Sequence, residues 1–483
     1  MSFRKLVAAV SLLAIFTMAL RVSISGDTWW HLRAGTWILE NGRILRHDPF
    51  SLTRAGHPWL YPGWLAQILM VLTYQTLGYA GLNLFTAFSV LIGFAFVWRS
   101  VEAPPLLKGF TFVLGAASAG VYWSARPHIL SFALTGVLIW ALHRARQRGG
   151  SAIWLWPVLI ALWANLHGGF AIGLLLLGIE LISAGLDSIT PARFALTRSA
   201  GTNLSLGRIA AGTALSAAAV ALNPNGPAML TYPFKTVSIG VLQDYIQEWQ
   251  SPNFHSLELQ PFLWMLLLTL IFLALSPRRP SWRELITVGV FAYLAFLAAR
   301  NVALFGLVAL PVLTTHLNAT LQSWLPRREG GSQLPQKTTR VLNLVLFVAL
   351  VAAAAAKSIA PLSKKVNEAA IEEQTPVAAV DFLLEARPAG PLLNSYNWGS
   401  YVIWALHPQY LSFVDGRTDL FDDEILVEYL QLWRADPGWE QIVKRWDLRV
   451  ALLEPDAPIT AELLKAGWRV LYEDPQAVVL AAG

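Results

Sequence analysis

The chain alternates long apolar segments with short polar ones up to about residue 357. Eleven apolar segments have about the 17–25 residues that a helix needs to cross a bilayer. They lie at 5–22, 81–98, 107–124, 128–144, 152–168, 169–187, 207–223, 260–276, 284–300, 301–318 and 341–357. We expect the first to be a retained span, because no clean small-residue cleavage site follows it. The pattern predicts an α-helical polytopic membrane protein with about eleven transmembrane helices.

Composition agrees with this prediction. The 483 residues are 55% hydrophobic and only 14% charged, which is too few charges for the surface of a soluble domain of this length. The sequence has no cysteine, so disulfides and thiolate metal sites are excluded. The membrane part is basic. We interpret its Lys and Arg residues as signals that orient the loops across the membrane rather than as a nucleic-acid-binding surface.

A twelfth apolar segment, 63–78, is short and carries four polar side chains. If it does not cross, the loops after residue 81 divide into a side with 15 Lys and Arg and a side with only Arg126, Lys235 and Arg300. The basic loops include Arg193, Arg198, Arg327 and Arg328. Because basic loops favour the cytoplasm, we expect 63–78 to lie in the outer interface. The N-terminus is then inside and the C-terminal segment outside.

This topology makes residues 23–80 a long outer loop with two interfacial helices. The first helix is expected over TWWHLRAGTWILENG, residues 28–42. Its indole rings, Trp29, Trp30 and Trp37, suit the lipid headgroup zone, where tryptophan commonly anchors a membrane protein.

The sequence divides into a transmembrane domain, 1–357, and an extracytoplasmic domain, 358–483. The last 127 residues carry a net charge of −8, whereas the preceding residues carry +14. Strand-like and helix-like runs alternate in this acidic part, which predicts a small α/β domain with a largely parallel sheet. One strand is expected over 410–416. The DGRTD sequence that begins at Asp415 is either part of a binding crevice or a solvated turn with a structural Asp–Arg pair.

Unusual polar residues gather at the outer ends of the predicted spans and in the outer loops. Ionisable groups near bilayer depth are costly and commonly functional, so we interpret them as candidate substrate-binding residues. They are Arg126, His128, Asn165, His167, Glu248, Arg300 and Asn301. Each has a structural alternative. Arg126 and Arg300 would snorkel to lipid headgroups. Asn165 would cap a helix or make an interhelical hydrogen bond, and His167 would be a hydrogen-bonded interface histidine.

The first outer loop supplies three candidate catalytic residues, Asp27, His31 and Asp48. A carboxylate at Asp27 can accept a proton from an acceptor hydroxyl, or hold Mg²⁺ or Mn²⁺ beside a phosphate. His31 would share the face of Asp27 if the segment is helical. Asp48 precedes Pro49 and is alternatively a helix cap or a turn residue. Arg126 or Arg300 would clamp the phosphate, because guanidinium groups pair bidentately with phosphate oxygens.

These features resemble the GT-C class of membrane glycosyltransferases. The resemblance rests on a first span, an outer loop with an early acid, the DPFS turn and the HPWLYPGWL surface helix. The chain more closely resembles a group of largely uncharacterised bacterial membrane proteins. That resemblance rests on GDTWWHLRAG, ARPHILSF, WANLHGGFAIG, ARNVALFGLVALP and VDGRTDLF. The class implies a polyprenyl-phosphate-linked sugar donor, with Asp27 as the acid of the first outer loop. Protein O-mannosyltransferases and the oligosaccharyltransferase catalytic subunit are more distant. SYNWGSY departs from the latter, with Asn397 in place of an acid.

The sequence therefore predicts an inverting hexosyl- or pentosyltransferase of the bacterial inner membrane and cell envelope. It would transfer a sugar to a glycan, lipid or protein acceptor at the extracytoplasmic face. Asp27 and Arg126 or Arg300 are expected to line one outward-facing cavity. An alternative is a non-catalytic lipid-linked glycan binder or transporter, and another is a sensor whose C-terminal domain binds a partner. The inner half of the spans has few polar residues, which favours chemistry at the outer face.

Overall fold

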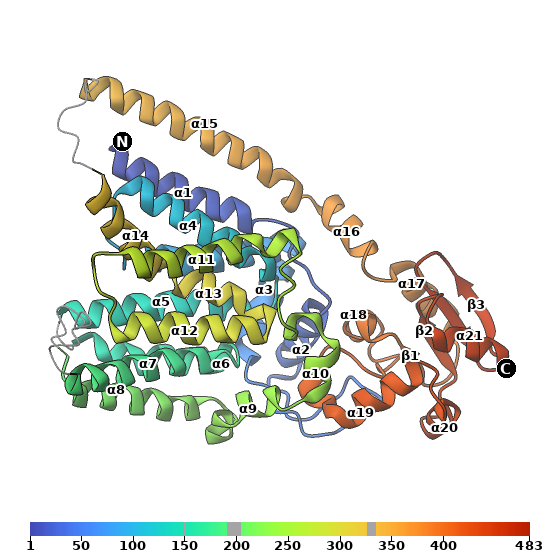
Figure 1. The fold of residues 1–483 in the computed structure, drawn as a ribbon. Helices are drawn as coiled ribbons and strands as arrows, with labels where there is room; N and C mark the ends of the chain where they lie inside the picture. The colour runs from blue at the N-terminus through green and yellow to red at the C-terminus, as the bar shows by residue number, and fades with distance from the viewer. Residues whose placement is uncertain (149–150, 191–203, 326–334) are drawn as a thin grey trace. The chain divides into compact units, whose positions relative to one another are not determined.

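The structure, a computed structural model, describes residues 1–148, 151–190, 204–325 and 335–483 (Figure 1). The chain forms two compact units. Unit 1 comprises Met1–Ser23, Asn83–Pro233 and Gln247–Leu362, and unit 2 comprises Ile24–Leu82, Phe234–Ile246 and Ser363–Gly483. The C-terminal segment therefore folds with most of the first predicted outer loop. The division into domains 1–357 and 358–483 stays a prediction. Four arginines of the predicted basic loops, Arg193, Arg198, Arg327 and Arg328, lie outside the described residues.

The described residues of unit 1 form helices joined by short loops and turns. Its helices are α1 (Phe3–Ala19), the later part of α3 (Trp64–Trp98), α4 (Pro105–Ala119), α5 (His128–Arg148), α6 (Leu155–Leu166), α7 (Phe170–Ile189), α8 (Leu206–Ala219), α11 (Gln260–Leu275), α12 (Trp282–Leu297), α13 (Val302–Val308), α14 (Leu310–Trp324) and α15 (Gln336–Leu362). Short 3₁₀ turns include η1 (Gly120–Tyr122), η6 (Gln247–Trp249) and η8 (Ala299–Asn301). Each of the eleven predicted apolar segments overlaps at least one of these helices.

Not every helix is long enough to cross a bilayer by itself. In the described part of the chain five helices have the necessary length and apolar character, or six if α13 and α14 form one bent span. The predicted span 301–318 is built from two helices, α13 and α14, which meet at 49°. Pro311 lies in the first turn of α14, and proline cannot donate the backbone hydrogen bond that would continue a helix. The count of eleven crossings stays a prediction.

A break in α3 separates the two apolar segments that the sequence distinguished. Gly78 has φ 59° and ψ −147°, so the helix is interrupted there. Glycine adopts this left-handed region at little cost because it has no Cβ. The segment 64–77 and the following segment are therefore two helices. The interfacial position of 63–78 stays a prediction.

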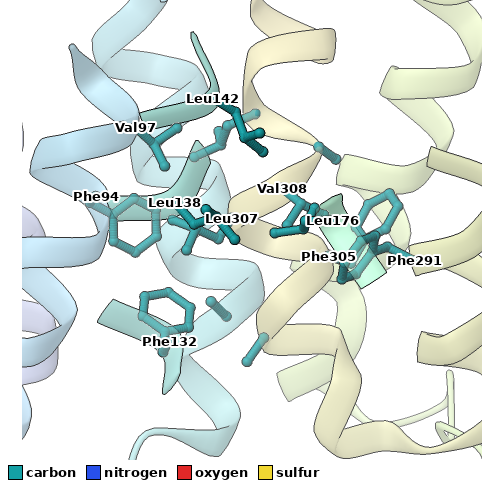
Figure 2. Close-up of a cluster of buried hydrophobic side chains, with 14 of the residues drawn as sticks. Phe94, Val97, Phe132, Leu138, Leu142, Leu176, Phe291, Phe305, Leu307 and Val308 are labelled. Carbon is teal, nitrogen blue, oxygen red and sulfur yellow. The ribbon is translucent and has the colours of Figure 1, made fainter. Parts of the chain in front are cut away.

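The interior of unit 1 is filled by large apolar side chains from α3, α5, α7, α12 and α13 (Figure 2). Phe94, Phe291 and Phe305 are fully buried, and Phe132 is nearly so. Helices inside a bilayer gain little from leaving lipid, so their association depends on close packing of this kind. This packing fixes the helix ends, where the candidate residues lie.

Unit 2 combines helices with a small sheet. Its helices are α2 (Thr28–Asn41), the start of α3, α10 (Gly240–Tyr245), α16 (Lys364–Glu372), α17 (Val377–Ala386), α18 (Tyr396–Leu406), α19 (Thr418–Trp433), α20 (Trp439–Arg445) and α21 (Pro458–Lys465). The strands are β1 (Leu392–Asn394), β2 (Val450–Leu453), β3 (Arg469–Glu473) and β4 (Val478–Ala481). Helix α9 (Tyr232–Val237) includes the point at which the chain passes from unit 1 to unit 2, after Pro233.

The predicted largely parallel sheet is wrong. The strand order is β1-β2-β4-β3, and only β1 and β2 are parallel. Only residues 474–477 connect β3 and β4, and a connection that short joins antiparallel strands. The expected strand over 410–416 does not form either. Ser412 makes one isolated bridge to Ser51, so this segment pairs with the first outer loop instead.

Helix α2 forms as predicted and ends at Gly42, which has φ 63°. However, Trp29 and Trp30 are only 1% and 4% exposed, so their expected place among lipid headgroups is wrong. Trp29 packs against Tyr401 and Trp404 of α18, with ring centroids 5.1 and 6.1 Å apart. Trp29 thus holds α2 against α18 inside unit 2, because buried aromatic pairs supply large contact areas.

Candidate functional site

In unit 1, Glu248 forms ion pairs with two arginines, Arg126 and Arg300, which are distant from it and from each other in the sequence. Arg126 donates from Nη2 to Oε2 of Glu248 at 2.9 Å, and Nη1 of Arg300 lies 3.5 Å from Oε1. The Arg126 Nε also donates to the Ser124 hydroxyl at 3.1 Å. We call Arg126, Glu248 and Arg300 the double-arginine cluster. The structure thus unites three predicted substrate-binding residues.

Local structure holds this cluster in place. Arg126 precedes α5, Arg300 lies in η8, and Glu248 lies in η6. The backbone N–H of Ala299 donates to the carbonyl of Gln250 at 2.9 Å, which ties η8 to the η6 segment. The Arg300 guanidinium also stacks 4.6 Å from the centre of the Trp249 ring. Such cation–π contacts orient a guanidinium without using all its hydrogen-bond donors.

The charges in the cluster are shielded from solvent. The side chains of Arg126, Glu248 and Arg300 are 17%, 23% and 28% exposed. Burial alone would raise the pKa of Glu248, but Arg300 and Arg126 outweigh it and lower the pKa to about 2. Glu248 is therefore ionised at neutral pH. Two guanidinium charges and one carboxylate leave a net charge of +1, which favours binding of an anion.

Two predicted histidines lie near each other, with their ring centres 6.5 Å apart: His128 is the first residue of α5, and His167 follows the last residue of α6. The Nε2 of His128 donates to the carbonyl of Tyr122 at 2.9 Å. The Nδ1 of His167 accepts from the backbone N–H of Gly169 at 3.0 Å and from the Ser131 hydroxyl at 2.8 Å. The proton of neutral His167 is consequently on Nε2. These bonds fix both rings, and a role in substrate binding stays a prediction for each.

The predicted asparagines make helix contacts. The Asn165 amide donates to the carbonyl of Ala161 at 2.8 Å, and the Asn301 amide donates to the carbonyl of Leu294 at 2.9 Å. The Asn165 bond is an i to i−4 bond within α6 rather than a helix cap, and the Leu294 carbonyl also accepts from the Ala298 N–H at 3.1 Å. Contact of either asparagine with a substrate stays a prediction.

In unit 2, Asp27 is the N-terminal flanking residue of α2, but its side chain does not cap that helix. The carboxylate instead lies against Gly416, where an added Cβ would overlap Oδ1 of Asp27. His31 follows one turn along α2, with its backbone N–H 3.4 Å from the carbonyl of Asp27. Its side chain is only 4% exposed and lies beside Trp30 and Tyr61. Catalytic roles for Asp27 and His31 stay predictions.

Asp48 is 2% exposed and belongs to a buried ion network with Arg417 and Asp415. It also accepts hydrogen bonds from the backbone N–H groups of Phe50 and Ser51 and from the Ser51 hydroxyl. These local bonds are those of a turn residue, the alternative that the sequence left open. They favour a structural role for Asp48, and its predicted catalytic role has no support from these contacts.

Arg417 is the residue of this network that sequence reasoning underestimated. It is 1% exposed and donates to both carboxylate oxygens of Asp415 at 2.8 Å, as well as to Asp48. Burial would lower the pKa of Arg417, but Asp415 and Asp48 raise it above its ordinary value. The Asp–Arg pair expected in DGRTD exists, but it is buried rather than solvated. A short-range pattern could not have revealed Asp48 as the third member.

The fit of a divalent cation depends on Asp27. The described part of the chain contains no group of three or more His, Asp or Glu side chains arranged to hold a metal ion. Magnesium is commonly bound by one or two carboxylates together with substrate phosphates rather than by an all-protein cage. A single partly exposed carboxylate at Asp27 fits that arrangement.

Comparison with solved structures shows what fold these elements form. The chain is similar to the oligosaccharyltransferase AglB from Archaeoglobus fulgidus in complex with an inhibitory peptide and a dolichol-phosphate. The TM-score is 0.57 and the identity 11%, over 96% of this chain and 71% of that one. It is also similar to ArnT from Cupriavidus metallidurans bound to undecaprenyl phosphate. That match has a TM-score of 0.52 and 14% identity, and it covers 99% of this chain and 97% of that one.

Both of these proteins are GT-C glycosyltransferases, so the chain has the GT-C fold that the sequence resemblance predicted. The AglB structure tethered to an acceptor peptide with an NVT sequon matches as well, at a TM-score of 0.57 and 11% identity over 100% of this chain and 74% of that one. No protein-family model and no curated protein sequence matches this chain.

Proposed function

We propose that this chain is a membrane glycosyltransferase that transfers a sugar from a polyprenyl-phosphate-linked donor. The observation that carries the proposal is the pairing of Arg126 and Arg300 with one carboxylate, Glu248, in a chain with the GT-C fold. Guanidinium groups bind phosphate oxygens with the same fork geometry that they use for carboxylates. The double-arginine cluster would therefore bind the phosphate of the donor.

In the proposed reaction, an acceptor O–H or N–H attacks the anomeric carbon of the donor sugar. The new bond to that carbon forms as its bond to the phosphate oxygen breaks, and the bonding electron pair stays on the phosphate. The acceptor proton passes to the carboxylate of Asp27. Attack opposite the leaving phosphate inverts the anomeric centre. Arg126 and Arg300 stabilise the charge that develops on the leaving group, because preorganised cations in a shielded site act most strongly there.

The proposal includes a divalent cation as a second partner of Asp27. Asp27 would hold Mg²⁺ or Mn²⁺ together with phosphate oxygens of the donor, and the ion would neutralise part of the phosphate charge. Loss of turnover in EDTA that Mg²⁺ or Mn²⁺ restores would support this assignment. Full turnover in EDTA would remove the cation from the proposal.

The proposed reaction takes place at the outer face of a bacterial inner membrane. The supporting observation is the distribution of Lys and Arg among the sequence loops, which favours an inside N-terminus and an outside C-terminal segment. The donor would reach the cluster from the outer leaflet, since polyprenyl chains are lipids. A glycan, lipid or protein of the cell envelope would be the acceptor, and the sugar would be a hexose or a pentose.

The proposal is tested with purified protein in lipid nanodiscs. Arg126→Gln and Arg300→Gln should each weaken binding of a short-chain polyprenyl phosphate and lower sugar transfer from the corresponding donor. Arg340→Gln is the matched control, because Arg340 is an exposed arginine of α15 in the same unit. Equal binding by all three variants would contradict the phosphate assignment. Donor binding without any transfer, across a panel of acceptors, would favour the non-catalytic binder.

A further inference from the structure

The loop of Asp415, Gly416 and Arg417, which we call the DGR loop, lies directly against the Asp27 carboxylate within unit 2. A methyl group at position 416 would overlap Oδ1 of Asp27 and lie 3.1 Å from its carboxyl carbon. The backbone N–H of Gly416 donates to the Ser400 hydroxyl at 3.4 Å. The space that the Asp27 carboxylate occupies therefore exists because residue 416 has no side chain.

Buried charges hold the DGR loop on both sides of Gly416. Asp415 accepts hydrogen bonds from the Ser412 hydroxyl at 2.9 Å and from the backbone N–H of Arg417 at 3.0 Å. The Arg417 guanidinium is bound to both Asp415 and Asp48. It also lies 5.0 Å from the centre of the Trp59 ring. A buried charge network of this kind has few alternative arrangements, because any broken pair leaves a charge without compensation.

The network also fixes the segment that carries Asp48. Ser412 bonds to it through both backbone groups: the Ser412 N–H donates to the Phe50 carbonyl at 3.1 Å, and the Leu52 N–H donates to the Ser412 carbonyl at 2.7 Å. The Thr53 hydroxyl donates to the Phe413 carbonyl at 2.7 Å. The first outer loop and the C-terminal segment are thus bonded together on the N-terminal side of Gly416.

We propose that Gly416 and Arg417 are positioning residues for Asp27. Gly416 supplies the surface against which the carboxylate rests, and Arg417 holds that surface through Asp415 and Asp48. The inference rests on the proposed function, in which Asp27 accepts the acceptor proton. It assigns the C-terminal segment a direct part in transfer, because a reacting group must be held within a fraction of an ångström of its productive position.

The test is Gly416→Ala, with Gly26→Ala as the steric control. A methyl group at Gly26 would make only an ordinary 3.7 Å contact with the carbonyl of Asn397, although Gly26 adjoins Asp27. We expect Gly416→Ala to lower kcat by about 10²-fold, since a misplacement of about 1 Å can have that effect. The donor KM should stay at the parental value, because the double-arginine cluster is unchanged. Gly26→Ala should keep the parental kcat.

Ser400→Ala is the second variant, and it decides the matter if Gly416→Ala does not fold. It removes the hydroxyl that accepts from the Gly416 N–H but introduces no overlap. We expect a smaller fall in kcat, again with an unchanged donor KM. A folded Gly416→Ala protein with parental kcat would overturn the inference. So would a parental kcat for Ser400→Ala when Gly416→Ala fails to fold.

Asp27→Asn separates this inference from the proposed function. If Asp27→Asn is inactive while folded Gly416→Ala is fully active, only the positioning role of the DGR loop fails. If Asp27→Asn transfers sugar at the parental rate, the proposed role of Asp27 fails, and the positioning inference fails with it. A fall in both kcat and donor affinity for Gly416→Ala would indicate general damage to the fold and would also count against positioning.

Discussion

Arg417 binds Asp48 across a separation of 369 positions in the chain, and both side chains are fully buried. Asp415 completes the network on the other side of the same guanidinium. The network joins the first predicted outer loop to the C-terminal segment within one compact unit. Its stability is therefore a condition for the geometry around Asp27.

Loss of the Arg417 charge should strongly destabilise the chain. Arg417→Met leaves Asp48 and Asp415 buried without a counter-charge, which typically costs about 3–5 kcal/mol. Thermal unfolding of the full chain in detergent measures the effect. Arg449→Met is the control, because Arg449 and its partner Asp447 are 60% and 67% exposed. Such surface pairs contribute about 0–1 kcal/mol. Equal losses for the two variants would contradict a buried, tightly held network.

Removal of the Glu248 charge should strengthen donor binding. Glu248→Gln leaves two guanidinium groups with no carboxylate between them, so the net charge of the double-arginine cluster rises from +1 to +2. One added charge is worth at least about 1 kcal/mol at contact distance, or roughly a fivefold lower Kd for a polyprenyl phosphate. Native mass spectrometry of the lipid complex measures this change. Glu258→Gln is the control, because Glu258 is an exposed acid of the same unit. Weaker binding by Glu248→Gln would show that Glu248 mainly positions the arginines.

The contribution of Glu248 to stability should disappear in acid. Its pKa in the folded chain is about 2, below its ordinary value of 4.5. A group with a lowered pKa stabilises the fold above its ordinary pKa, and this stabilisation is lost as the pH falls toward the folded value. The Tm difference between the parental chain and Glu248→Gln should stay constant from pH 8 to 5 and shrink below pH 4.5. A difference that shrinks above pH 6 instead would implicate another group.

Neutralisation of Asp27 should abolish most turnover while sparing the fold. Asp27→Asn keeps the size of the side chain but removes the base, and a positioned base contributes roughly 10²–10⁴-fold to a rate. Transfer from a polyprenyl-phosphate sugar measures the loss, with Asp381→Asn on an exposed position of α17 as the control. His31→Ala should give a smaller, pH-sensitive defect. Parental turnover by a folded Asp27→Asn protein would favour the binder.

The segment 63–78 should not cross the membrane. Topology reporters inserted after Gly42 and after Tyr79 should both indicate the outer side, because the helix before the break at Gly78 is short and partly polar. The two insertion sites flank the segment, so each serves as a reference for the other. A cytoplasmic signal after Tyr79 alone would contradict the eleven-span topology and move the C-terminal segment inside.

The sequence by itself determined the features that depend on near neighbours. Apolar run length predicted the helical segments of unit 1, and the sequence at 28–42 predicted α2, because such patterns report local backbone structure. The same reasoning placed Arg126, Glu248 and Arg300 among the candidate residues, since charges near a bilayer are conspicuous. It did not predict that Glu248 pairs with both arginines.

Tertiary structure alone decided which distant residues meet. The pairing of Asp48 with Arg417, the contact of Gly416 with Asp27 and the burial of Trp29 against α18 join segments more than 300 positions apart. A side chain's local sequence does not encode the identity of such a partner. The same aspartate suits water or a buried ion pair, and the same indole suits lipid headgroups or a buried ring contact. The fold selects one of these environments by closing the space around the side chain and leaving it a single compensating partner.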